Sequence, residues 1–217
     1  SDNFVNGKRF SSLYSQNLDT KTEKILIKNK RNLLPPKLNK NGDINFVINN
    51  ELKSIQKTSL KKNSALKNSI EQFVNIDNTK IALHKNGTTK ILDPIENGNY
   101  IWPEISPDGD KLLFNDVNSG TYISDLDGNI LVELGQMNYP KWSPDGSWIC
   151  YMIDEDDGHR FTKSEIYVIS SDGKNKFQLT NTETQIEMYP SWSPDSKKIV
   201  YHNLSGNIFI MNLKITK

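Results

Sequence analysis

An acidic run with a histidine and an arginine is the densest group of reactive side chains in the sequence. It reads Asp154-Glu155-Asp156-Asp157-Gly158-His159-Arg160. Clustered carboxylates are the hard oxygen ligands that Ca²⁺ takes, although the spacing lacks the alternation of an EF-hand loop. The other interpretation is a solvated loop between two strands. Loops on a rigid scaffold commonly carry recognition, so part of this run is a candidate binding surface. Its members are Asp156, Asp157, His159 and Arg160, and calcium is the one cofactor that the sequence suggests.

Four tryptophans are a second source of binding chemistry, because an indole ring can stack on a sugar or anchor a protein interface. They are Trp102, Trp142, Trp148 and Trp192. Trp142 and Trp192 recur at one place in a repeat, which predicts that they pack between neighbouring elements. Trp148 falls outside that pattern, just after an Asp-Gly turn. We therefore expect Trp148 to be partly exposed and regard it as the best single aromatic contact.

Catalytic motifs are not found in the sequence. There is no Gly-x-Ser-x-Gly and no His-Glu-x-x-His pattern. His84, His159 and His202 fall in different predicted units, and a metal-binding or base role stays open for any one of them. Cys150, the single cysteine, lies in an alternating apolar run, so we expect a buried, unreactive thiol. The sequence thus predicts no enzyme and defines no metal site.

The repeat that carries the tryptophans also specifies the elements around them. An aromatic residue precedes a proline, a large apolar residue stands two positions later, and Ser-Pro-Asp-Gly or Ser-Pro-Asp-Ser follows. The aromatic residues that open the three copies are Trp102, Tyr139 and Tyr189. Proline presets φ for a tight turn, aspartate satisfies backbone amides, and glycine takes the left-handed position. Because apolar residues alternate after the turn, each copy predicts an antiparallel hairpin.

Two charged residues occupy a variable place in this repeat. Glu104 and Lys141 stand between the proline and the large apolar residue, where the scaffold does not dictate the residue type. They are therefore candidate binding residues for a ligand that uses the channel of a ring-shaped fold. Asp108 and Asp145 are near them in the repeat, but turn chemistry alone accounts for both aspartates.

A second hairpin follows the first in each clear copy. The segments 122–132 and 166–179 each read as a strand, an Asp-Gly turn and another strand. Four short strands in about 40 residues, repeated in tandem, are typical of the blade of a β-propeller. A β-sandwich with accidental self-similarity is the alternative.

The stretch 139–151, with its partner Ile-Tyr-Val-Ile-Ser-Ser-Asp-Gly at 166–173, resembles the WD-like repeat of the TolB family of bacterial β-propellers. The resemblance is specific over 99–213 and weak before it. It implies a propeller of the periplasm or cell surface that binds other proteins rather than performing catalysis. Similar repeats build the gating propellers of prolyl-oligopeptidase-like and tricorn-like peptidases and the body of some oligosaccharide lyases, so the resemblance bears on fold more than on function.

The first 98 residues carry degenerate copies of the same pattern. A hairpin is expected over 13–27, a worn first hairpin over 34–48, and a fainter one over 73–83. The last unit ends without an outer strand, and a segment near the N-terminus could complete it, because closure removes exposed sheet edges. We therefore expect an all-β chain in which residues 1–217 form one closed β-propeller of four-stranded antiparallel blades, with six blades favoured over five.

The composition of the chain limits the kinds of partner that we expect it to bind. The 217 residues include 27 basic and 26 acidic ones, and the net charge of +1 offers no field to attract nucleic acid. No apolar run approaches the roughly 18 residues that span a bilayer, and no signal peptide is visible at the start. The lysine-rich stretch 53–67 is expected to form solvated outer strands; a basic patch for an acidic partner is the alternative.

Two functions remain open on these grounds. The first is a monomeric, non-catalytic propeller of the bacterial envelope that binds another protein. The second is an oligosaccharide-binding or lyase-like propeller that uses its channel, with a divalent metal at the mouth.

Overall fold

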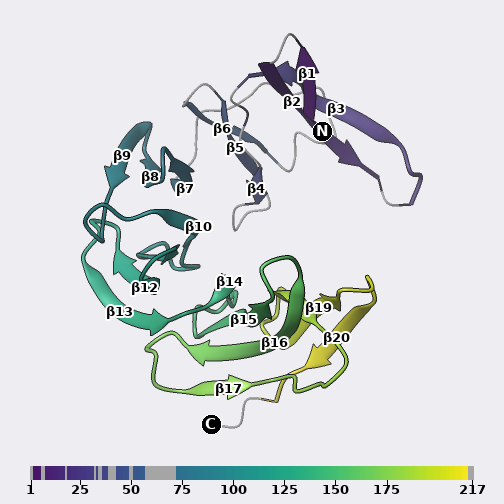
Figure 1. The fold of residues 1–217 in the computed structure, drawn as a ribbon. Helices are drawn as coiled ribbons and strands as arrows, with labels where there is room; N and C mark the ends of the chain where they lie inside the picture. The colour runs from purple at the N-terminus through teal and green to yellow at the C-terminus, as the bar shows by residue number, and fades with distance from the viewer. Residues whose placement is uncertain are drawn as a thin grey trace. The chain divides into compact units, whose positions relative to one another are not determined.

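The computed structural model describes residues 2–5, 8–17, 19–31, 33, 36–38, 43–48, 51–56 and 72–214. All regular elements in these ranges are β-strands (Figure 1). None of the described residues forms a helix that is long and apolar enough to cross a membrane. Most of the lysine-rich stretch 53–67 lies outside the described residues, as does the turn of the worn repeat at 39–42, so the predictions made for them stay predictions.

The chain divides into two compact units, one of residues 1–73 and 84–89 and the other of residues 74–83 and 90–217. The first unit holds two three-stranded antiparallel sheets. Their strands are β1 (Asp2–Val5), β2 (Lys8–Gln16) and β3 (Glu23–Lys30), then β4 (Lys37–Leu38), β5 (Ile44–Ile48) and β6 (Glu51–Ile55). The hairpin expected over 13–27 is present as β2 and β3, and β1 adds a strand that the sequence did not predict.

A third sheet has strands that run across the division between the units. It consists of β7 (Gln72–Asp77), β8 (Lys80–Lys85) and β9 (Thr88–Leu92). Its first two strands coincide with the faint repeat expected over 73–83. The middle strand β8 is buried from Ile81 to His84, which is the burial expected of a strand covered on both faces.

The second unit contains the clear repeats as three antiparallel sheets. Their strands are β10 (Tyr100–Ile105), β11 (Lys111–Asp116), β12 (Gly120–Asp125) and β13 (Ile130–Gly135); β14 (Asn138–Trp142), β15 (Trp148–Asp156), β16 (Phe161–Ser170) and β17 (Lys176–Gln178); and β18 (Glu187–Trp192), β19 (Lys198–Asn203) and β20 (Ile208–Asn212). The prediction of four strands holds for the first two of these sheets. The last has three described strands, as expected of a unit that lacks its outer strand.

The turn between the first two strands follows the predicted chemistry in every clear repeat. The aspartate accepts a hydrogen bond from the serine hydroxyl two residues before it, as Asp145 Oδ1 does from Ser143 Oγ at 2.6 Å. The next residue has positive φ, which is +85° at Gly109, +73° at Gly146 and +58° at Ser196. Turn bonds thus account for the repeat aspartates, as the sequence predicted.

The apolar cores lie between consecutive sheets. One cluster joins Leu113 and Ile123 of the β10–β13 sheet to Ile149 and Ile169 of the next sheet. Trp142 is buried in this same cluster, which confirms its predicted packing role. Equivalent clusters join β7–β9 to β10–β13 and β14–β17 to β18–β20, and Trp192 packs against the latter. Since each sheet is covered by its neighbour, the second unit is held together by layers of contact rather than by one central core.

Candidate functional site

The aromatic residues that open the three clear repeats lie on the first strands β10, β14 and β18. Trp102, Tyr139 and Tyr189 have φ values of +53°, +54° and +53°. In all three sheets, the pairing with the second strand shifts register across the aromatic residue and the proline that follows it. Bulges of this kind bend a strand and re-aim its side chains. Left-handed backbone is uncommon for bulky residues, so the recurrence shows that the aromatic position is built the same way in each repeat.

These aromatic residues contact one another across the sheets. The Trp102 and Tyr139 rings meet edge to face at 6.2 Å between centroids, and the Tyr139 and Tyr189 rings do so at 5.0 Å. His202 of β19 stacks on Tyr189 at 5.4 Å. We call Trp102, Tyr139, Tyr189 and His202 the aromatic row. Edge-to-face contacts at these distances are favourable, so the row is a continuous surface made by three sheets.

The aromatic row is suited to binding because its side chains are at least partly exposed and some of its hydrogen-bonding groups have no partner among the described residues. Tyr189 is 42 % exposed, and Trp102, Tyr139 and His202 are partly exposed. Within the described part of the chain, no hydrogen-bond partner is found for the hydroxyls of Tyr139 and Tyr189 or for the indole nitrogen of Trp102. Aromatic faces combined with available donors are typical of protein interfaces and sugar sites.

Glu104 and Lys141 lie beside the aromatic row and next to each other. Lys141 Nζ is 4.8 Å from the centre of the Tyr139 ring and 3.9 Å from Glu104 Oε1. Glu104 Oε2 accepts a hydrogen bond from the Trp142 amide at 3.0 Å, which ties β10 to β14. The structure therefore brings together the two variable residues that the sequence singled out. It also gives Glu104 a structural role that the sequence did not reveal.

Trp148 lies on β15, away from the repeat position that Trp142 and Trp192 share. Its side chain is partly buried against the cluster between β14–β17 and β18–β20, and its ring is 5.9 Å from that of Phe177. Phe177 is 53 % exposed. The predicted partial exposure of Trp148 is confirmed, and Trp148 and Phe177 form a small aromatic patch. Its role in binding stays a prediction.

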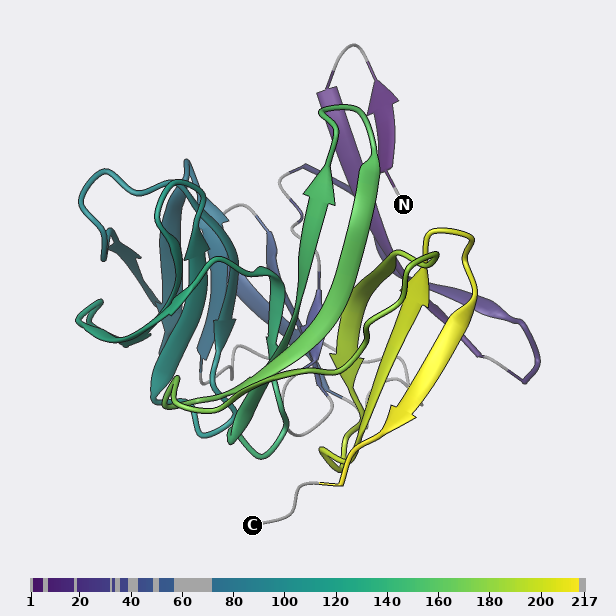
Figure 2. The ribbon, with the colours of Figure 1, turned by 60° about the horizontal axis from the view of Figure 1, so that its bottom comes forward.

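The acidic run occupies the tip of the hairpin made by β15 and β16. Figure 2 shows that this hairpin extends beyond the other strands of its sheet. Asp156 accepts a hydrogen bond from the Gly158 amide, and Asp157 accepts from the amides of His159 and Arg160. These amide bonds, from Arg160 and then His159, hold the pKa of Asp157 below its usual value. The carboxylates thus close their own turn, and calcium binding here stays a prediction.

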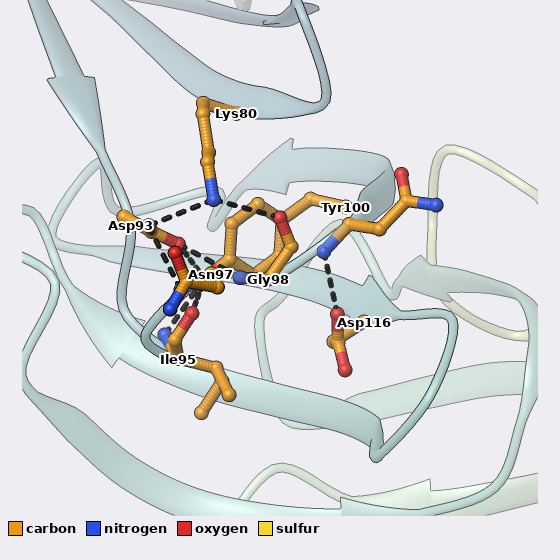
Figure 3. Close-up of polar contacts among 8 residues, drawn as sticks. Lys80, Asp93, Ile95, Asn97, Gly98, Tyr100 and Asp116 are labelled. Atoms are coloured by element: carbon orange, nitrogen blue, oxygen red, sulfur yellow. Dashed lines mark hydrogen bonds and ion pairs between the residues drawn. The ribbon is translucent and has the colours of Figure 1, made fainter.

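A polar network around Asp93 was not anticipated from the sequence. Asp93 accepts hydrogen bonds from Lys80 Nζ at 2.7 Å, from Tyr100 Oη at 2.7 Å and from the amides of Asn97 and Gly98 (Figure 3). Burial on its own would raise the pKa of Asp93, but the bonds from Lys80 and Tyr100 and the two amides outweigh it and lower the pKa.

The Asp93 network stabilises the connection between β9 and β10 and is not suited to bind a ligand. Tyr100 Oη also pairs with the backbone of Ile95, and the Asn99 amide donates to Asp116 Oδ1 at 2.7 Å. Its polar atoms are therefore largely occupied by protein partners, which leaves little for a ligand. The signal in the sequence was the segment 93–100, whose Asp, Pro, Asn and Gly residues predict a turn but not its partners.

The remaining reactive side chains, Cys150, His84 and His159, lie on different elements. Cys150 is fully buried, as predicted, and burial raises the pKa of its thiol. His84 is buried with Nδ1 2.8 Å from the Thr89 hydroxyl, and His159 lies in the exposed hairpin tip. In the described ranges, no group of three or more His, Cys, Asp or Glu side chains is placed to hold a metal ion.

Comparison with known proteins shows which fold this chain has. No protein-family model and no curated protein matches the sequence. Among solved structures, a TolB protein of Agrobacterium tumefaciens is similar with a TM-score of 0.58 and 17 % identity, over 94 % of this chain and 90 % of that one. The tricorn protease is similar with a TM-score of 0.52 and 16 % identity, over 88 % of this chain but only 22 % of the protease. At these identities the likeness concerns architecture alone, and the chain has a TolB-like β-propeller fold.

Proposed function

We propose that this chain is a non-catalytic, TolB-like β-propeller of the bacterial cell envelope that binds another protein. The observation that carries the proposal is the aromatic row, where Trp102, Tyr139 and Tyr189 are presented by three sheets. Rigid scaffolds present side chains without much loss of conformational entropy on binding. Aromatic side chains of this kind dominate the binding energy of protein interfaces.

The rest of the molecule supports a binding role over a catalytic one. The similarity to a TolB protein concerns the fold, and the near-neutral charge favours neither nucleic acid nor an anionic surface. Lys141 and Glu104 beside the row supply one charge of each sign, which suits a partner with polar groups around an apolar anchor. A periplasmic or cell-surface location and a monomeric state are part of the proposal.

The proposal extends to the architecture. The six sheets of the described residues would be the blades of one closed ring over residues 1–217, in which a segment near the N-terminus completes the last sheet. The three-stranded sheet β18–β20 supports this, because its two preceding neighbours have a fourth strand. Closure would cover an edge that otherwise stays open to aggregation.

The test is partner capture from an envelope extract of the source organism, followed by affinity measurement with the purified partner. Tyr189→Ala and Trp102→Ala are expected to weaken binding about 30-fold or more each, the size of an interface hot spot. Phe177→Ala is the matched control, because Phe177 is an exposed aromatic residue outside the row. Equal binding by all variants would remove the row from the interface, and a partner lost only with Phe177→Ala or Trp148→Ala would move the site there.

A second candidate function is oligosaccharide binding at the aromatic row, as a lyase-like propeller with a divalent metal would require. The observation that favours it is the set of unused hydroxyl and indole donors beside exposed ring faces. Titration of neutral and acidic oligosaccharides, followed by tryptophan fluorescence of wild type and Trp102→Phe, tests it. Saturable quenching that is lost in the variant would support this function over protein binding.

A further inference from the structure

Two glutamates of the second unit are buried without balancing charge. Glu165 on β16 is 1 % exposed, and Glu187 at the start of β18 is 2 % exposed. None of the ion pairs among the described residues includes either one. An ionised carboxylate in such surroundings is costly unless it is paired or bound to a cation. The two side chains are therefore expected to have a partner beyond this chain's basic residues.

A single threonine holds both carboxylates. The Thr182 amide donates to Glu165 Oε1 at 2.9 Å, and the Thr182 hydroxyl donates to Glu187 Oε1 at 2.9 Å. The same hydroxyl lies 3.3 Å from the Gln185 carbonyl, yet it has only one hydrogen to give. Both Oε2 atoms are buried and have no hydrogen-bond partner. Four carboxylate oxygens thus share two donors.

Tyr201 on β19 lies near both carboxylates. Burial and then the charges of Glu187 and Glu165 raise the pKa of Tyr201 on β19. Both carboxylates therefore act on one phenol from two different sheets. The Tyr201 hydroxyl can donate to an ionised carboxylate but cannot neutralise it.

We propose that Glu165 and Glu187 bind a hard divalent cation, of which Ca²⁺ is the expected species. Two carboxylates alone are few for a metal site, but Ca²⁺ takes six to eight oxygen ligands and accepts hydroxyls, backbone carbonyls and water among them. The unpartnered Oε2 atoms would be the principal ligands. The Thr182 hydroxyl and the Gln185 carbonyl lie within the same hydrogen-bonded group and could complete them.

The bound cation would join two sheets of the second unit. Glu165 belongs to the β14–β17 sheet, Glu187 to the β18–β20 sheet, and Thr182 to the connection between them. Cation binding would then stabilise the folded state by mass action. This site is separate from the aromatic row and does not depend on the proposed function.

Calorimetric titration of the metal-free full chain with Ca²⁺ tests the proposal, together with thermal unfolding in Ca²⁺ and in chelator. One bound ion is expected, and a hundredfold excess over Kd should raise Tm by about 5 °C or more. Glu165→Gln and Glu187→Gln should each weaken binding at least about tenfold. Asp156→Asn with Asp157→Asn is the matched control, which removes two carboxylates from the exposed hairpin tip and should leave the titration unchanged.

Three results would overturn the proposal. Wild-type protein that shows no heat of binding and no Tm shift with Ca²⁺ does not bind it, whatever the variants do. Ca²⁺ binding that is lost only in the Asp156 and Asp157 variant belongs to the hairpin tip. Glutamine variants that bind Ca²⁺ as tightly as the wild type, with the same rise in Tm, show that Glu165 and Glu187 are not its ligands.

Discussion

The connection between β9 and β10 depends on a single side chain, Asp93, which accepts four hydrogen bonds. In place of water, the carboxylate has four donors, namely the Lys80 ammonium group, the Tyr100 hydroxyl and two backbone amides. Its pKa in the folded state lies below the value of about 3.9 for an unfolded chain. The network therefore stabilises the protein above the unfolded pKa, and this contribution is lost as the pH falls through the folded pKa.

Asp93→Asn is expected to reduce the free energy of unfolding at pH 7 by about 1 to 2 kcal/mol, a range kept low because the carboxylate is partly exposed. Urea unfolding at pH 7 and at pH 2.5 measures the change, and the difference from wild type should shrink at the lower pH. Asp127→Asn removes an exposed pair with Lys90 and serves as control, with an effect below about 1 kcal/mol. A difference that is the same at both pH values would contradict the role assigned to the Asp93 charge.

Gly98 lies against the face of Tyr100 within the same connection. A Cβ atom at this position would overlap the Tyr100 ring, which is almost fully buried and held by its hydroxyl bonds. Gly98→Ala should therefore cost more than about 2 kcal/mol in unfolding free energy. In the background of Tyr100→Leu the same change should cost much less, because the clashing atoms are gone. Additive effects of the two substitutions would show that the ring is not the obstacle.

At the scale of elements, the packing of neighbouring sheets depends on the repeat tryptophans. Trp192 Nε1 donates to the Lys141 carbonyl at 3.1 Å, whereas Trp142 Nε1 is buried without a partner. The two residues occupy one repeat position but differ in how the indole is used. Trp142 therefore stabilises the folded protein through its apolar contacts, and its unpaired indole nitrogen reduces that stabilisation.

Trp142→Ala should lower the free energy of unfolding by about 3 to 5 kcal/mol because it leaves a cavity between two sheets. Trp142→Phe should cost only about 1 to 2 kcal/mol, since it keeps a ring and removes an unpaired donor. Chemical denaturation of both variants measures this, with Trp148→Ala as a partly exposed comparison expected to cost less than Trp142→Ala. A Phe variant as unstable as the Ala variant would mean that the indole nitrogen is satisfied in solution.

At the scale of the whole molecule, the proposed closed ring makes a prediction about size. A compact domain of 217 residues has a radius of gyration of about 17 Å. Small-angle scattering of monomeric protein should give this value, and unfolding should follow one transition by several probes. A markedly larger radius, or separate transitions for the two units of the chain, would contradict closure.

The sequence alone determined the features that are encoded locally. The Ser-Pro-Asp-Gly turns, the alternating strands, the buried Cys150 and the packed Trp142 follow from a few neighbouring residues, because turn geometry and strand period are short-range properties. One contact in the turn of the last repeat is not encoded locally. Ser196 stands where two repeats have glycine, yet its hydroxyl accepts a hydrogen bond from the Asp145 amide at 3.1 Å, a contact that the consensus could not reveal.

Which distant residues meet depends on the tertiary structure. Tyr139 and Tyr189 are separated by a whole repeat, and nothing in the sequence around either one specifies that their rings touch. The same holds for Lys141 with Glu104, and for Glu165 and Glu187, which one threonine brings together. Such contacts depend on how the sheets twist and stack, and this arrangement is set by burial summed over many residues rather than by any short motif.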